Sequence, residues 1–138
     1  MIPAHITAEE LHSIGAPAVV PSESPSEDFG VVFEDDGQTG YFYALDLSSG
    51  GQAIVDATHI YNVQQVQDRD RPSSVKIGWS TNGWSAVLLI NDYPHAVFDF
   101  QGQRGYCRSG FPQSSIGSLW PRSAHTWSDQ ALNLFSEP

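Results

Sequence analysis

The stretch VKIGWSTNGWSAVLLINDYPHAVFDF, residues 75–100, decides the fold, because it contains three apolar runs separated by two short turns. Every second residue from Val75 to Trp79 is apolar, which is the period-two pattern of a β-strand. Asn82-Gly83 follows and is well suited to a tight hairpin turn. Asn91-Asp92 opens a second turn before the last run. Strands joined so closely must be antiparallel, because a parallel pair needs a crossover of a dozen or more residues.

The same pattern extends on both sides of this stretch. Asp36-Gly37 lies between two further runs and can take the positive φ angles of a hairpin. The additional strand-like segments are FGVVFE (29–34), GYFYALDL (40–47), AIVDATHIYNV (53–63) and, as a short last strand, part of GYCRSGFP (105–112). The sequence therefore predicts a meandering antiparallel sheet of six to seven strands.

Both ends of the chain are predicted to add helices. Thr7-Ala-Glu-Glu10 has the spacing of a capping box, which predicts a short helix over residues 8–14. Residues 16–28 are rich in Pro, Ser and acidic residues and indicate an extended connector without a core face. Thr126-Trp-Ser-Asp129 repeats the capping-box spacing and predicts a closing helix that packs on the sheet.

These expectations combine into an α+β fold with two parts. Residues 1–28 form the N-terminal helix and its acidic connector. Residues 29–138 form a single antiparallel-sheet domain with the C-terminal helix. A chain of 138 residues is long enough for one domain with a hydrophobic core and too short to expect two.

The negative charge is concentrated in the first half of the chain. The net charge is −10, and residues 1–68 hold 11 of the 16 acidic residues but no Lys or Arg. Such a field repels phosphate backbones and anionic lipid and attracts cationic surfaces. The charge therefore predicts a protein partner with a basic surface, no direct nucleic-acid binding and no membrane binding. Solubility alone is the alternative reason for the charge.

The single cysteine, Cys107, excludes an internal disulfide and fits a reducing compartment. It lies beside Arg108, which allows either a reactive thiol or a small core residue.

The N-terminus MIPAHITAEELHS has neither the basic nor the apolar region of a signal peptide, and no apolar run reaches the length of a membrane span. We expect a cytoplasmic protein.

Polar residues on the predicted strands suggest an active site only if different strands bring them together. His95 and Asp99 lie on one strand, ~13 Å apart at ~3.3 Å per residue, so neither can orient the other. A metal site that joins His95 to His59 and Asp56 would need a bulge, because His59 and Asp56 point to opposite faces of a regular strand. We expect no metal and no cofactor.

The acidic run Glu34-Asp35-Asp36-Gly37 superficially suggests a calcium loop, but it lacks the ligand spacing of an EF-hand and is better explained as a charged hairpin tip. The four tryptophans, Trp79, Trp84, Trp120 and Trp127, suit a recognition surface and a core equally well.

Four segments resemble a family of small bacterial proteins described as a domain of unknown function. They are VVFEDDGQTGYFYALD (31–46), HIYNV (59–63), LLINDYPHAVFDF (88–100) and GYCRSGFP (105–112). The resemblance covers roughly residues 29–112. It implies a bacterial cytosolic protein and assigns no activity to any residue.

Two functions from different classes follow, and the absence of any catalytic motif favours the first. The first is a binding or inhibitory protein of the immunity type, which neutralises a cationic partner such as a toxin by covering its surface or active site. Its predicted partner-binding residues are Glu34, Asp35, Asp36, Asp46, Asp56 and Trp84. The alternative is a small enzyme or ligand-binding protein that uses His59, His95, Asp99 and Tyr106 on the polar face of the sheet. A structural component of a larger assembly is a third possibility.

Overall fold

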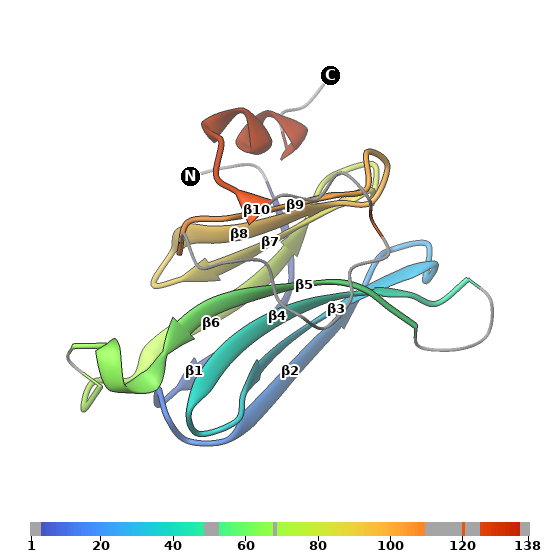
Figure 1. The fold of residues 1–138 in the computed structure, drawn as a ribbon. Coiled ribbons are helices and arrows are strands. Elements are labelled where there is room, and N and C mark those ends of the chain that lie inside the picture. The colour runs from blue at the N-terminus through green and yellow to red at the C-terminus, as the bar shows by residue number, and fades with distance from the viewer. Residues whose placement is uncertain (1–3, 49–52, 68, 110–119, 121–124, 136–138) are drawn as a thin grey trace.

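The computed structural model describes residues 4–48, 53–67, 69–109, 120 and 125–135, and these form two stacked β-sheets (Figure 1). The six-stranded sheet has the order β1-β6-β7-β8-β9-β10, and the four-stranded sheet has the order β2-β3-β4-β5. The strands of the six-stranded sheet are β1 (His5–His12), β6 (Ser73–Trp79), β7 (Ser85–Ile90), β8 (Tyr93–Asp99), β9 (Arg104–Cys107) and β10 (His125–Thr126). Those of the four-stranded sheet are β2 (Ala18–Glu23), β3 (Phe29–Asp35), β4 (Thr39–Asp46) and β5 (Ala53–Asn62).

The predicted hairpins are present. Asn82-Gly83 connects β6 to β7, with Gly83 at φ 75°. Asn91 and Asp92 connect β7 to β8 and both have positive φ angles, 53° and 65°. Asp36-Gly37 connects β3 to β4, with Gly37 at φ 97°. All the β2-to-β5 and β6-to-β9 neighbours are antiparallel, whereas β10 pairs with β9 in parallel.

The predicted N-terminal helix and connector are wrong. Residues of the supposed helix belong to β1, which pairs antiparallel with β6 more than sixty residues later in the chain. The supposed connector contains β2, an edge strand whose Val20 is buried in the core. Pro21 is tolerated there because an edge strand needs no partner on its outer side. The single predicted meander is therefore two sheets, and each one includes an N-terminal strand.

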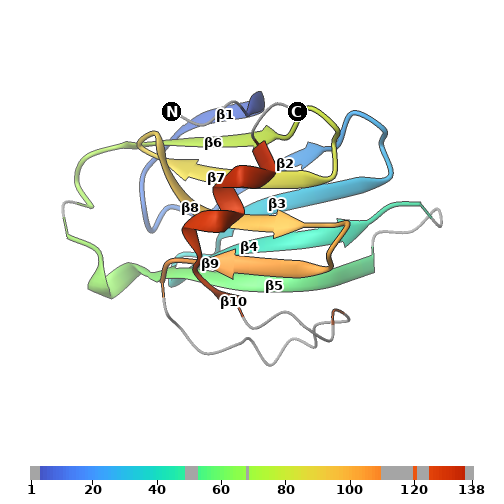
Figure 2. The same ribbon diagram turned by 90° about the horizontal axis from the view of Figure 1, so that it is seen from above.

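The molecule is mainly β, and the helices of the described chain are short 3₁₀ elements, η1 (Val63–Gln65) and η2 (Asp129–Phe135). The C-terminal helix predicted from residue 126 is thus a 3₁₀ helix that begins at Asp129. It lies across the outer face of the six-stranded sheet (Figure 2). Its Ala131 and Phe135 are buried against Val87, Leu89 and Val97.

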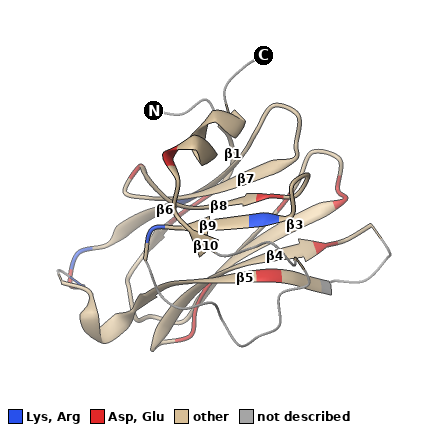
Figure 3. Ribbon diagram, turned by 45° about the horizontal axis from the view of Figure 1, so that its top comes forward, with Lys and Arg blue, Asp and Glu red and all other residues tan. Residues whose placement is uncertain are grey.

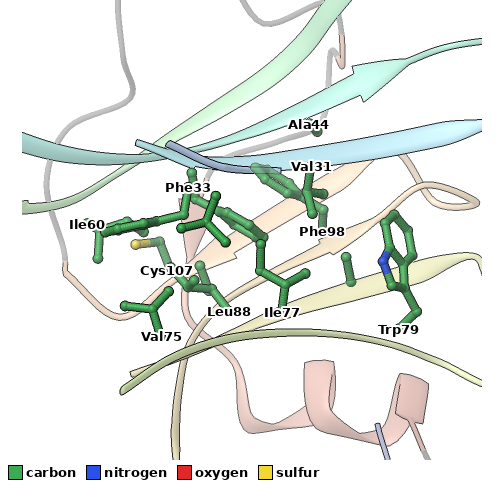
Figure 4. Packing of buried hydrophobic residues seen from close by; sticks show 14 of the residues in the cluster. Val31, Phe33, Ala44, Ile60, Val75, Ile77, Trp79, Leu88, Phe98 and Cys107 are labelled. Atoms are coloured by element: carbon green, nitrogen blue, oxygen red, sulfur yellow. The ribbon is translucent and has the colours of Figure 1, made fainter. Parts of the chain in front are cut away.

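The main core fills the space between the two sheets (Figure 4). Val31 and Phe33 come from the four-stranded sheet, and Leu88 and Phe98 face them from the six-stranded sheet. Burial of such side chains contributes about 1.5–3 kcal/mol each. Two of the four tryptophans, Trp79 and Trp120, are buried in this core, whereas Trp84 is 41% exposed.

Candidate functional site

The outer face of the four-stranded sheet carries aromatic, aliphatic and acidic side chains. Alternation along the strands places buried residues such as Phe33 and Phe42 inward, and the residues next to them in sequence outward. No element of the described chain lies over this face (Figure 1). We call it the open face and define it by Val19, Val32, Glu34, Tyr41, Tyr43, Leu45, Ile54 and His59.

Two tyrosines and a glutamate form the centre of the open face. The rings of Tyr41 and Tyr43 are stacked with their centroids 5.7 Å apart. The Tyr43 hydroxyl donates a hydrogen bond to Oε1 of Glu34 at 3.2 Å. Partial burial and the neighbouring Glu34 carboxylate raise the pKa of Tyr43 above its ordinary value, which favours the neutral phenol that donates to Glu34. The centre therefore combines flat aromatic surface with a carboxylate held in place.

His59 extends this cluster. Its ring centroid lies 5.6 Å from that of Tyr41, and its Nε2 lies 2.8 Å from Oδ1 of Asn62. Because an amide oxygen can only accept, Nε2 carries the proton.

Aliphatic side chains flank the aromatic centre on the edge strands. Val19 on β2 is 61% exposed, and Ile54 on β5 is 41% exposed. Clusters of exposed aromatic and aliphatic residues with a polar rim mark interaction surfaces.

Four of the predicted partner-binding residues lie on the β3–β4 hairpin that forms the middle of this sheet, and three of them, Glu34, Asp36 and Asp46, are not buried. Glu34 is on the open face, and Asp36 is at the hairpin tip, where Oδ1 accepts from the amides of Gln38 and Thr39. Asp46 is at the opposite end of β4, where hydrogen bonds from the hydroxyl and amide of Ser48 lower its pKa. Red segments in Figure 3 mark such acidic positions, and the blue basic segments lie elsewhere, for instance on β9.

Trp84, also predicted to bind a partner, lies on the β6–β7 hairpin of the other sheet. Its ring contacts that of Phe29, with the centroids 5.1 Å apart. Phe29 is the cross-strand neighbour of Asp46, so Trp84 is adjacent to one end of the four-stranded sheet rather than on the open face.

Asp35 was predicted to bind a partner, but it is only 1% exposed and belongs to an interior network. Its Oδ2 lies 3.0 Å from Nε2 of His12 and accepts hydrogen bonds from the Tyr61 hydroxyl at 2.6 Å and the Gly15 amide at 2.7 Å. Burial alone would raise the pKa of Asp35, but hydrogen bonds from Tyr61, from the Gly15 and Gly37 amides and from His12 together lower it. The network joins β1 of one sheet to β3 and β5 of the other.

Asp56 was also predicted to bind a partner and is also buried, with 0% of its surface exposed. Its Oδ1 lies 2.8 Å from Nε2 of His125 on β10, so this pair is a second link between the two sheets. Position 105 beside this contact favours glycine, because a Cβ there would come within 2.6 Å of Oδ2 of Asp56. Sequence reasoning missed both histidines, because His12 and His125 have no local motif around them.

The residues predicted for an enzyme do not converge. His59 is on the open face, and His95 lines a pocket beside η1. Asp99 is at the other end of β8 from His95, where Oδ1 accepts from the amides of Gln101 and Gly102. Tyr106 packs with the cluster beneath η2 on the far side of the six-stranded sheet.

The other predicted reactive groups also have structural roles in the described chain. Cys107 is buried, and burial raises the pKa of its thiol, as expected for a core residue. The carboxylates of the acidic run diverge, since Asp35 points inward and Asp36 binds its own turn. No group of three or more His, Cys, Asp or Glu residues able to hold a metal is found among the residues that the structure describes.

In the described part of the chain, no helix is long and apolar enough to cross a membrane.

Comparison with known proteins gives a family but no activity. Residues 12–136 match the model of the family described as "uncharacterized protein conserved in bacteria (DUF2251)". A protein from Haemophilus influenzae, itself named "uncharacterized protein", is 45% identical over 123 residues, which cover 88% of this chain and 76% of the relative. No solved structure gives a significant match.

Proposed function

The chain belongs to this bacterial family of uncharacterized proteins, and within it we propose that the protein is a binding protein of the immunity type. It covers a basic surface of a partner protein, such as a toxin, with the open face of its four-stranded sheet. The observation that carries this proposal is the half-buried Tyr41–Tyr43 stack on the open face, with Glu34 hydrogen-bonded beside it.

The chemistry of the open face selects the partner. Tyrosine rings bind Lys and Arg through cation–π contacts, and the stems of those side chains pack on apolar surface. Glu34 provides a carboxylate for the same cation. No Lys or Arg occurs in residues 1–68, so the strands of this sheet contain no cation of their own to neutralise the face. A partner surface rich in Lys and Arg is therefore complementary in charge.

A second copy of the same chain is a poorer occupant of the open face. Each copy carries a net charge of −10, with the acidic residues concentrated in the half that forms this sheet. Like charges brought together across an interface are destabilising. The charge thus favours a different, basic protein, and the cytoplasm is where we expect the two to meet.

The decisive experiment begins with the basic proteins encoded next to this gene, because an immunity protein is normally encoded beside its toxin. Each is expressed with and without the present chain, and growth and complex formation at low salt are measured. We expect one neighbour to inhibit growth when it is expressed alone and to form a stoichiometric complex with the present chain. Expression of the two together should restore growth. If no neighbour binds at low salt, the proposal is wrong.

Two tyrosine variants then show which surface of the protein contacts the partner. Tyr43→Ser removes a ring from the open face, whereas Tyr93→Ser removes a ring that is 51% exposed on the other sheet. Only the first should weaken the complex. Equal losses for both variants would show that the open face is not the binding surface.

The alternative function, a small enzyme that uses His59, His95, Asp99 and Tyr106 together, has no supporting juxtaposition among the described residues.

A further inference from the structure

A pocket of about 470 Å³ opens between the ends of the two sheets, beside η1. The end of β5, the loop before β6, the end of β7 and the start of β8 contribute to its wall. Its floor is aliphatic and includes Ile60 and Ile90, and its polar lining is Tyr61, Gln67, Arg71, Ser73, Asn91 and His95. An apolar floor with a few polar groups, at this volume, is typical of sites for small molecules.

A β-bulge determines the position of His95 in this pocket. Ala96 pairs with Leu88 and Pro94 pairs with Leu89, so His95 is an extra residue without a cross-strand partner. Bulges redirect side chains and are common beside functional sites. His95 therefore does not follow the alternation that would place it on the same face as Val97, and it lines the pocket instead.

The imidazole of His95 is available to a ligand. Its ring contacts Tyr93 edge-on, with the centroids 5.5 Å apart, and makes no hydrogen bond to another described side chain. Burial and the nearby Arg108 guanidinium lower the pKa of His95, so the ring is neutral at physiological pH and offers one N–H donor.

Arg71 supplies a positive charge at the same pocket. Two other cations of the described chain are held in ion pairs: Nζ of Lys76 lies 2.6 Å from Oδ1 of Asp92, and the Arg108 guanidinium lies 3.7 Å from Oδ1 of Asp129. Arg71 is exposed and has no ion pair among the residues that the structure describes. Arg69 and Arg104 also have no described ion pair, but Arg71 is the one of these three that lines this pocket, where its guanidinium can pair with an anion.

We propose that this pocket binds a small organic carboxylate. The Arg71 guanidinium pairs with the carboxylate, and the neutral ring of His95 donates a hydrogen bond to it. The aliphatic floor holds the apolar part of the ligand. This site is separate from the open face and does not depend on the partner-binding function.

The test is a titration of the full chain followed by backbone amide NMR shifts at constant ionic strength. The probes are benzoate and hexanoate, with benzamide as the neutral analogue and inorganic phosphate as a compact anion. We expect the carboxylates to shift the amides of Gln67, Arg71, Asn91 and His95 saturably. Benzamide should bind about tenfold more weakly, since it lacks the charge that pairs with Arg71.

Matched variants test whether the charge of Arg71 is the one that binds the carboxylate. Arg71→Gln should weaken carboxylate binding about tenfold, and His95→Ala about threefold, without altering the fold. Arg69→Gln removes the same charge from the same loop, but Arg69 does not line this pocket, so affinity should be unchanged. Tyr43→Ser on the open face should also leave it unchanged.

Three results would overturn the proposal. The first is no saturable shift with either carboxylate. The second is an equal loss of affinity for Arg69→Gln and Arg71→Gln, which would mean general attraction to the loop. The third is stronger binding of phosphate than of either carboxylate, which would assign the pocket to a compact anion.

Discussion

On the outer face of the six-stranded sheet, Val87 and Val97 lie beneath η2 and are fully buried, whereas on the open face of the four-stranded sheet Val19 remains 61% exposed. Both faces carry aliphatic and aromatic side chains. The chain uses its own C-terminal segment to cover one face and leaves the other without a described cover. The difference separates residues that stabilise the fold from residues that are available to a partner.

The largest expected effect is on the covered face. Phe135→Ala removes a side chain that is 1% exposed and leaves a cavity beneath η2, so we expect a loss of about 4 kcal/mol in the free energy of unfolding. Tyr41→Ala on the open face should cost less than about 1 kcal/mol. Urea unfolding of both variants measures the contrast. Equal losses would mean that the open face is also part of the stabilising structure.

Removing the Asp35 carboxylate, which links the two sheets, should lower stability without changing the side chains on either outer face. Asp35→Asn removes the charge that accepts from His12, Tyr61 and the Gly15 amide, and should cost about 3 kcal/mol at neutral pH. Folding lowers the pKa of Asp35 below its reference value of 3.8, so the carboxylate stabilises the fold above that pH.

This stabilisation is lost as the pH falls through the lower pKa of the folded state. The difference in unfolding free energy between the wild type and Asp35→Asn should therefore narrow below about pH 4. Urea unfolding at a series of pH values follows this difference. The Tyr41→Ala variant serves as the control and should keep the acid dependence of the wild type. A difference that stayed constant down to about pH 2 would contradict the assigned role of Asp35.

A substitution on the open face should have a large effect on partner binding and a small one on the stability of the fold. Tyr43→Ser should weaken the partner complex by about 2 kcal/mol, roughly 30-fold in Kd, as for an interface hot spot. Its unfolding free energy should change by less than about 1 kcal/mol. Calorimetric titration with the partner, beside urea unfolding, gives both values. A stability loss as large as that of Phe135→Ala would remove the distinction between the faces.

The smallest expected effect concerns association rate. Glu34→Gln removes one charge from the open face and should slow association with a basic partner about threefold at low salt. The slowing should vanish at about 0.5 M salt, where exposed charges are screened. Glu10→Gln, an exposed acidic position on β1 of the other sheet, is the matched control and should have little effect. Stopped-flow mixing at two salt concentrations measures the rates.

Local signals allowed the seven strands from β3 to β9 to be predicted, because each run of alternating residues is bounded by a turn that depends on a nearby pair such as Asn82-Gly83. β1 was missed because the Thr7 to Glu10 spacing suits a helix cap locally, while its real partner, β6, lies far along the chain. Local propensity was overridden there by a long-range pairing.

The sites were harder to predict than the strands for the same reason. Asp35 and Asp56 were read as surface charges, because the histidines that bind them lie 23 and 69 residues away in sequence. His95 was assigned to the wrong face, since no local pattern reveals a bulge that depends on pairing with β7. The exposed acidic residues of the β3–β4 hairpin could be found, because a hairpin tip depends only on its own turn chemistry.

The order of the strands also has a consequence for how the protein is made. During synthesis, β2 to β5 can pair as soon as residue 62 has left the ribosome, since each neighbour follows the last in sequence. β1 must wait for β6, which ends at Trp79, before it gains its partner. The four-stranded sheet is thus complete while its inner apolar side still lacks the opposite sheet. β1 is thus made first but is among the later strands to join its sheet. Until the six-stranded sheet covers it, the apolar side of the four-stranded sheet is the part of the nascent chain most exposed to aggregation.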